Sequence, residues 1–281
     1  MSYFPIKDSH LKGGLLFSLC VIFYGLLLIP VKSRGDQQPA APPPPKIKAF
    51  QPGEALTYEA TWSNAMKMGT AVMEVRAERT SDGREVLLLI STSHTEGFAG
   101  SLYPLGDVVQ SVFDPEIMQP LSFNLHETQG KRQRRRIIEF DHEHNKVTVT
   151  KNEDPIKTFT IPDQVQDNLS SIYYLRTTED LTVGKTIKFE VFDGEQSVLI
   201  EVQVLGREKV KTPAGEFDTI KVTAHKGFLM SEGEITIWLT DDVRKIPVLI
   251  KGKIKIGSIV FNLKGLKTGG SPEPKQTESK N

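Results

Sequence analysis

The sequence predicts a mainly β fold: one large antiparallel, curved sheet of open-barrel or half-barrel form, with a single α-helix packed against it. Apolar and polar residues alternate from Leu56 to Ile256, with turn residues between the runs, which is the period of strands with one buried face. Only residues 163–179 show helical spacing instead. A sheet this large needs closure or a cover to protect its edges. No repeat is evident, which argues against a propeller or solenoid.

The chain begins with an apolar segment. Residues 13–31 carry no charge and lie between Lys12 and Lys32, and as a helix they can cross a hydrocarbon core of about 30 Å. Residues 1–12 are therefore expected to be cytoplasmic, and 13–31 to be a transmembrane anchor or a signal peptide. A cleaved signal needs a shorter apolar run and small residues at the cleavage site, which Lys32 interrupts, so a retained anchor is favoured.

This segment predicts a single-pass inner-membrane protein with a periplasmic domain, or alternatively a soluble periplasmic protein after cleavage. Cys20, the only cysteine, lies inside the segment and follows Leu19. A lipoprotein signal would need a small residue there. The exported part therefore has no disulfide.

The rest of the chain divides into three parts. Residues 32–48 are expected to form a proline-rich, extended linker. Residues 49–266 are expected to form a β domain that is long enough to bury its own core. Residues 267–281 form a polar tail that has too few apolar residues to fold. Lys and Arg together number 35, as do Asp and Glu, so the charge balance gives no sign of a nucleic-acid partner.

The strands are expected wherever the alternation is regular. The apolar positions that define them are Leu56–Trp62, Ala71–Val75, Glu85–Ile90, Val147–Val149, Phe159–Ile161, Ile187–Val191, Val198–Val204, Ile220–Val222, Ile235–Ile237, Ile246–Ile250 and Ile254–Ile256. Residues 212–215, Thr-Pro-Ala-Gly, are predicted to form a hairpin turn that Gly215 closes. Asp241 and Asp242 indicate a similar turn. Pro247 places its strand at an edge or a bulge.

One helix is predicted from Asp163, as N-cap, to a point near Glu179. Apolar and basic residues recur at helical spacing there, namely Val165, Leu169, Ile172, Tyr173 and Arg176. Asp163 has Gln166 three residues later as a reciprocal capping partner.

The strongest charge cluster is residues 131–136, Lys-Arg-Gln-Arg-Arg-Arg. As a strand it presents Arg132, Arg134 and Arg136 on one side. Two interpretations apply: a site for an anionic envelope component such as a lipid phosphate, or a solvated hairpin arm that discourages edge pairing.

Three aromatic residues, Trp62, Tyr173 and Trp238, are predicted on core faces or near the helix. They could line an apolar ligand pocket between helix and sheet, or simply form the core.

The sequence indicates no catalytic residues, no metal site and no cofactor. His142 and His144 share a strand face but are expected in a solvated turn. Asp167, Ser170 and Ser171 supply the residue types of a hydrolase triad, yet no nucleophile-elbow motif is present. Glycine-rich phosphate loops are absent.

Several motifs in order resemble the DUF3108 family of exported bacterial proteins of undefined function. They are Gly53-Glu54-x-Leu56-x-Tyr58, Ser111-x-x-Asp114, Gln166-Asp167-x-Leu169-Ser170-x-x-Tyr173-x-Leu175-Arg176, Thr212-Pro213-Ala214-Gly215-x-Phe217, Trp238-Leu239-Thr240-Asp241-Asp242-x-Arg244-x-x-Pro247-Val248 and Gly257-Ser258. The resemblance covers about residues 50–265 and implies a Gram-negative envelope protein with a barrel-like or half-barrel sheet. It carries over no catalytic residue. The motif positions Asp167, Ser170, Arg176, Gly215, Asp242 and Arg244 are interpreted as architectural.

The favoured function is a non-catalytic envelope domain that binds an apolar or anionic amphiphilic, lipid-like ligand. The candidate ligand residues are Arg132, Arg134, Arg136, Trp62, Tyr173 and Trp238. The alternatives are a periplasmic scaffold that binds an envelope protein and, last, an envelope-polymer hydrolase. The expected partners are the membrane, through the N-terminal segment, and a lipid or envelope protein, but no nucleic acid. The sequence does not indicate the oligomeric state.

Overall fold

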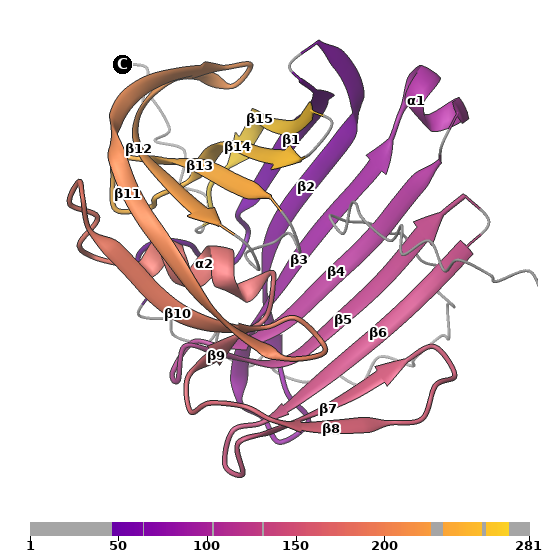
Figure 1. Ribbon diagram of the computed structural model, residues 1–281. Coiled ribbons are helices and arrows are strands. Elements are labelled where there is room, and N and C mark those ends of the chain that lie inside the picture. Colours follow the sequence, from indigo (N-terminus) through magenta and orange to yellow (C-terminus); the bar gives the residue numbers. More distant parts are fainter. Residues whose placement is uncertain are drawn as a thin grey trace, which may run out of the picture.

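The computed structural model describes residues 47–63, 65–102, 104–130, 132–225, 233–254 and 257–269. The predicted segments 1–12 and 13–31, most of the linker 32–48, and nearly all of the tail 267–281 lie outside them. The described strands form one 15-stranded sheet in the order β8-β7-β6-β5-β4-β3-β2-β1-β15-β14-β13-β12-β11-β10-β9. Figure 1 shows that this sheet curves around the helix α2. The predicted fold class is confirmed.

The first half of the chain forms one wing of the sheet as a meander. Its elements are β1 (Ala55–Trp62), β2 (Met66–Arg79), β3 (Glu85–Thr95), α1 (Gly97–Leu102), β4 (Leu105–Asp114), β5 (Gln119–Gln129), β6 (Arg132–Asp141), β7 (Lys146–Lys151) and β8 (Lys157–Thr160). The helix α1 was not expected from the sequence. It connects β3 to β4 at one end of the wing (Figure 1).

The second half of the chain forms the other wing. Its elements are β9 (Val165–Gln166), α2 (Ser170–Thr177), β10 (Thr186–Phe192), β11 (Ser197–Thr212), β12 (Gly215–His225), β13 (Glu234–Thr240), β14 (Pro247–Ile254) and β15 (Gly257–Lys267). The wings join where β1 pairs with β15. The two ends of the sheet are therefore β8 and β9, which follow each other in the chain.

The alternation in the sequence corresponds to the two faces of the sheet. In β1, Leu56, Tyr58 and Ala60 are buried, and they pair with Met73, Ala71 and Gly69 of β2. Their face is the concave one, and it packs around α2, whose Ile172, Tyr173 and Leu175 are also buried. The core thus lies between one helix and the inner face of a curved sheet, as the strand period requires.

The predicted helix was too long at its start. Residues Val165 and Gln166 form β9, which pairs in parallel with β10. They are held extended because Val165 N–H donates to the Gln119 side chain at 3.2 Å and Gln166 Nε2 donates to the Met118 carbonyl at 2.8 Å. These contacts come from the β4–β5 connection, so no local pattern signalled them.

The helix α2 begins at Ser170, not after Asp163. Asp167 Oδ1 accepts the N–H groups of Leu169 and Ser170 at 2.7 Å each. The side chain of Asp163 instead accepts a hydrogen bond from Asn145. Asp167 therefore satisfies the free N–H groups at the start of α2, the role that had been assigned to Asp163.

The predicted turns are present. Thr212 ends β11 and Gly215 opens β12, and Gly215 has φ +138°, a conformation that glycine adopts at no steric cost. Asp241 and Asp242 lie in the connection after β13. Pro247 opens β14, an interior strand, where the β13–β14 register shifts. Of the two placements expected for this proline, the bulge is the one found.

Candidate functional site

The basic run 131–136 leads into the first residues of β6. Arg132, Arg134 and Arg136 share the face of Ile138, which is buried in the core. Arg132 and Arg134 are exposed, and Arg136 is half-buried. The Arg136 Nη1 donates to the carbonyl of Asp193 at 2.8 Å. One of the three candidate arginines is therefore engaged by the opposite wing of the sheet.

The carbonyl that Arg136 binds belongs to the turn between β10 and β11, residues 193–196. This turn lies against β6, β7 and β8, and we call the contact the seam. Lys151 Nζ donates to Glu195 Oε1 at 2.6 Å. On its apolar side, the Phe192 ring contacts those of Phe140 and Phe159, with centroids 6.5 and 5.6 Å apart.

The seam brings the two ends of the unclosed sheet together through side chains. Gly194 in this turn has φ +98°, and a Cβ there would lie 2.7 Å from Arg136 Nη1. Glycine is therefore favoured at this position for its conformation, and an added Cβ would have to displace the guanidinium of Arg136.

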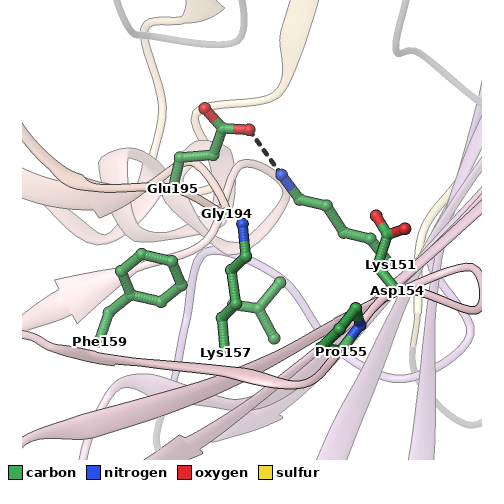
Figure 2. Close-up of a pocket in the computed structure, with 8 residues that line it drawn as sticks. Lys151, Asp154, Pro155, Lys157, Phe159, Gly194 and Glu195 are labelled. Carbon is green, nitrogen blue, oxygen red and sulfur yellow. Dashed lines mark hydrogen bonds and ion pairs between the residues drawn. The ribbon is translucent and has the colours of Figure 1, made fainter.

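A pocket of about 270 Å³ opens at the seam. Its lining combines apolar and charged groups: Val149, Lys151, Asp154, Pro155, Lys157, Phe159, Gly194 and Glu195. Figure 2 shows Lys157 between Phe159 and Lys151, with the Lys151–Glu195 contact crossing beside it. Next to it along the chain, Ile156 is 67 % exposed. The pocket thus has a basic part and an apolar part.

The pocket lining carries two cations, Lys151 and Lys157, and two carboxylates, Asp154 and Glu195. The hydrogen bond from Lys151 holds the pKa of Glu195 below its usual value, and the nearby charges of Arg136 and Lys157 lower it further. Glu195 is therefore an anion at neutral pH, surrounded by three cations. Among the described residues, no carboxylate lies within 4.0 Å of Lys157. A cation without a carboxylate partner at a pocket can accept an anionic group, and Lys157 is the lining residue that fits this description.

The aromatic candidates lie elsewhere. Tyr173 is fully buried on α2, with the Phe50 ring 4.8 Å away. Trp62 is half-buried, and its ring would meet a Cβ at Gly257. Trp238 alternates with the inward-facing Ile237 and Leu239 of β13 and so lies on the opposite face.

None of these three aromatics lines the seam pocket. On its own face of the sheet, the Trp238 ring has Lys221 Nζ 5.0 Å from its centroid and donates to Glu208. Trp238 is nevertheless only 8 % exposed and belongs to the buried hydrophobic cluster, so it agrees with the core position expected for it, although its face differs from that of Ile237 and Leu239. The aromatic residue that lines the pocket is Phe159, which the sequence marked only as a strand position.

The motif residues form two buried polar networks. In the first, Ser111 Oγ donates to Asp167 Oδ2 at 2.6 Å, and Asp167 N–H donates to Ser170 Oγ at 2.9 Å. All three side chains are fully buried, and burial raises the pKa of Asp167 to about 6. The hydroxyl of Ser170 is not accessible to a substrate, so this cluster joins α2 to β4 instead of forming a nucleophile site.

The second network surrounds Arg176 at the end of α2. Its guanidinium donates to both oxygens of Glu54, at 2.7 and 2.8 Å, and to the carbonyls of Ala49 and Arg244. Asp167 and Arg176 therefore bind other groups and not each other. Glu54 could not be paired with Arg176 from the sequence, because its partner lies on a distant helix.

Asp242 and Arg244 are paired in the turn after β13. Asp242 Oδ1 accepts the N–H groups of Arg244 and Lys245, and Asp242 Oδ2 binds the Arg244 guanidinium. Since the Arg244 carbonyl accepts from Arg176, this turn is fixed to α2. Asp242 and Arg244 thus stabilise a turn of the fold, as Gly215 does between β11 and β12.

A buried acidic pair lies on the inner face beside the basic run. Asp107 of β4 is opposite Glu127 of β5, which is opposite Arg134 of β6. Burial, with the Glu127 charge adding to it, raises the pKa of Asp107 to about 7, although the Thr128 N–H bond opposes the shift. Burial also raises the pKa of Glu127, and Arg134 opposes it. No local pattern marks this pair, since each acid is isolated in its own strand.

The histidine turn is not arranged for a metal. His142 Nε2 lies 2.7 Å from the Pro120 carbonyl, whereas His144 Nδ1 contacts Asp141. Within the described ranges, no group of three or more His, Cys, Asp or Glu side chains is placed to hold an ion. Nor is either helix in those ranges long and apolar enough to span a bilayer, and the segment 13–31 lies outside them.

Comparison with known proteins gives a family and a fold. A sequence profile of the family described as "Protein of unknown function (DUF3108)" matches residues 57–264. No curated protein matches the chain. A crystal structure of a "Beta-barrel-like Protein of Domain of Unknown Function DUF1849" from Brucella abortus is 12 % identical, covers 79 % of this chain and 100 % of its own, and superposes with a TM-score of 0.54.

Two more distant structures were also found. One is a putative exported protein with a YmcC-like fold from Bacteroides fragilis, 11 % identical, covering 78 % of this chain and 97 % of its own, with a TM-score of 0.31. The other is a putative lipoprotein from Parabacteroides distasonis, 12 % identical, covering 77 % and 96 %, with a TM-score of 0.32. Of these three structures, only the one from Brucella has a TM-score above 0.5, so it alone bears on the fold of this chain. That protein is described as beta-barrel-like.

Proposed function

This chain belongs to the DUF3108 family of proteins of unknown function, and we propose that it is an exported, non-catalytic domain of the cell envelope that binds an anionic amphiphile. The observation that carries the proposal is the seam pocket, which places the cations of Lys151 and Lys157 beside Phe159 and Val149. The predicted apolar segment 13–31 supports a location across a membrane.

The size of the pocket limits what it can hold. Its volume of about 270 Å³ is at the lower end for ligand sites, which typically measure roughly 300–1,000 Å³. The space suits an anionic head group and the first carbons of a chain, not a whole lipid. The remaining chain would pass over Ile156, the exposed apolar residue beside the pocket.

Lys157 is the group of the pocket that favours an anion over a neutral ligand, because no described carboxylate lies within 4.0 Å of it. Among the described carboxylates, Glu195 is the one that pairs with Lys151, and its side chain is 71 % exposed. Exposed ion pairs contribute about 0–1 kcal/mol, so a ligand can compete with Glu195 at little cost. Arg136 would add attraction from the far side of the turn.

The proposal is tested with soluble probes. Full-length protein, with segment 13–31 held in nanodiscs of neutral lipid, is titrated calorimetrically with monomeric octyl phosphate, and with octyl glucoside as the uncharged comparison. We expect octyl phosphate to bind more tightly, and Lys157→Gln to weaken it several-fold. The matched control is Lys188→Gln, an exposed lysine of β10 that pairs with Glu201 away from the pocket.

Equal affinity for the two detergents, or equal octyl phosphate binding by Lys157→Gln and Lys188→Gln, would contradict the proposal. Absence of binding by the native protein would favour a scaffold that binds an envelope protein.

A further inference from the structure

The helix α1 displays an aromatic side chain to solvent. Phe98 is 76 % exposed, whereas its neighbour Ala99 is buried against the sheet. Next to α1, Met66 at the start of β2 is 47 % exposed. Single exposed apolar residues are common on soluble proteins, so the meaning of this pair depends on how it is held and on what surrounds it.

The helix is fixed to the sheet by the residue before it. Glu96 N–H donates to the Met68 carbonyl at 2.9 Å, and the Glu96 carboxylate accepts from Thr70 at 2.6 Å and pairs with Lys67 at 3.0 Å. These groups hold the pKa of Glu96 at about 2. Gly100 packs so closely on the Thr95 carbonyl that a Cβ would lie 2.9 Å from its oxygen. Phe98 therefore lies on a short helix that hydrogen bonds and an ion pair of Glu96 hold against β2.

Free positive charge lies at the same end of the sheet. The turn between β5 and β6 is adjacent to the segment after α1, because Gly130 N–H donates to the Pro104 carbonyl at 2.8 Å. Beyond this turn, Arg132, Arg134 and Arg135 are exposed. Of these three arginines, only Arg134 has a described carboxylate within 4.0 Å of its guanidinium, that of Glu127 at 3.8 Å. Figure 1 shows α1 and this end of β5 and β6 on the same side of the molecule.

We propose that this end of the sheet, with Phe98 and Met66 flanked by Arg132 and Arg135, docks on an anionic lipid surface. A stable protein interface needs about 1,000 Å² or more of buried area, and two apolar side chains do not supply its core. Interfacial lipid binding needs less, because shallow insertion of an aromatic ring adds to the attraction of basic residues for anionic head groups. This inference does not rest on the seam pocket, which lies between β7–β8 and the β10–β11 turn.

Vesicle binding tests the inference. Full-length protein in nanodiscs of phosphatidylcholine, which accommodate segment 13–31, is mixed with vesicles of phosphatidylcholine and phosphatidylglycerol in equal parts, and bound protein is measured by flotation. Phe98→Ser should weaken binding about tenfold, because the variant loses the apolar surface that the inserted ring removes from water. Because Phe98 is exposed, the variant should fold normally, as circular dichroism will show.

The matched control is Leu199→Ser, which removes an apolar residue of β11 that is 52 % exposed and should leave vesicle binding unchanged. The pair Arg132→Gln and Arg135→Gln should weaken binding and flatten its dependence on salt. Three results would overturn the inference: no vesicle binding by the native protein, equal binding to vesicles of phosphatidylcholine alone, or equal losses from Phe98→Ser and Leu199→Ser. Any of these would leave the octyl phosphate result at the seam unaffected.

Discussion

The carboxylate of Glu54 and the guanidinium of Arg176, 122 positions apart in the chain, meet in the core through two hydrogen bonds of 2.7 and 2.8 Å. Both side chains are almost completely buried, and the Phe50 and Tyr173 rings each lie 5.3 Å from the Arg176 guanidinium carbon. A buried charge is tolerated only where its partners are complete. The pair therefore ties α2 to the start of β1.

Removing one charge of this pair should strongly destabilise the fold. Glu54→Gln leaves the Arg176 cation buried without its counter-ion, so we expect a loss of about 3–5 kcal/mol in the free energy of unfolding. Urea titration followed by circular dichroism measures it. As the control, Glu201→Gln breaks the exposed pair with Lys188 and should cost less than about 1 kcal/mol. Similar losses for the two variants would show that the Glu54–Arg176 pair does not hold α2.

The two tryptophans should differ in their contribution. Trp238 is 8 % exposed and has polar partners in Lys221 and Glu208, so Trp238→Ala should cost about 3–5 kcal/mol. Trp62 is only half-buried, and Trp62→Ala should cost less. Thermal unfolding of both variants checks the order. A larger drop in melting temperature for Trp62→Ala would contradict the placement of the rings.

The acidic pair predicts a dependence of stability on pH. Because the pKa of Asp107 is about 7 in the folded state and about 3.9 when unfolded, the folded protein binds the proton more tightly. Its contribution is fully present below about pH 4 and is lost as the pH rises to about 7, at up to roughly 1.4 kcal/mol for each pKa unit.

Asp107→Asn tests this contribution, because its amide oxygen can still accept the Thr128 N–H bond. The variant should match the native protein near pH 4 and exceed its stability at pH 8. Urea midpoints across this range measure the difference. Parallel curves for the two proteins would show that Asp107 does not titrate in this window.

The seam predicts a coupling between Gly194 and Arg136. Gly194→Ala should destabilise the fold by more than about 1 kcal/mol, because φ is +98° and the new methyl group would collide with the guanidinium. In an Arg136→Gln background the collision is relieved and the cost of Gly194→Ala should fall. A double-mutant cycle by urea unfolding measures this coupling, expected in the range of about 0.5–3 kcal/mol. Strictly additive effects would mean that the two residues do not touch in solution.

The N-terminal segment predicts how the protein fractionates. If residues 13–31 are retained, the protein should stay with membranes at high salt and high pH, and detergent should release it. N-terminal sequencing provides the check. A mature protein that begins near Arg34 or Asp36 would show that the segment is cleaved.

Local sequence patterns were sufficient to predict the strands but not sufficient to predict the seam. The alternation of Leu56, Tyr58 and Ala60 is a property of neighbouring residues, so it predicted a buried face directly. The start of α2 was misplaced because Gln119 and Met118, distant in sequence, hold β9 extended. Such contacts compete with helical propensity but have no signature in the segment itself.

The same reasoning explains the candidate site. The basic run predicted a surface of arginines, but the contact of Arg136 with Asp193 depends on where two ends of a long sheet meet. Lys157 and Phe159 belong to one strand, β8, whereas Glu195 lies in the turn between β10 and β11, and only that meeting makes Glu195 their neighbour. Their pocket therefore could not be read from spacing.

The pairing of β1 with β15 has a consequence for how the domain acquires its structure. The strand that begins the domain and the one that completes it are neighbours in the middle of the sheet, so neither wing can be joined to the other until the last strand is available. Closing a loop of almost the whole domain makes folding slow relative to a helical protein. During synthesis, each chain would therefore remain incomplete, with β1 and β14 as open edges, until its C-terminal strand is available. Faster folding of a circular permutant that joins β15 directly to β1 follows from this order of events.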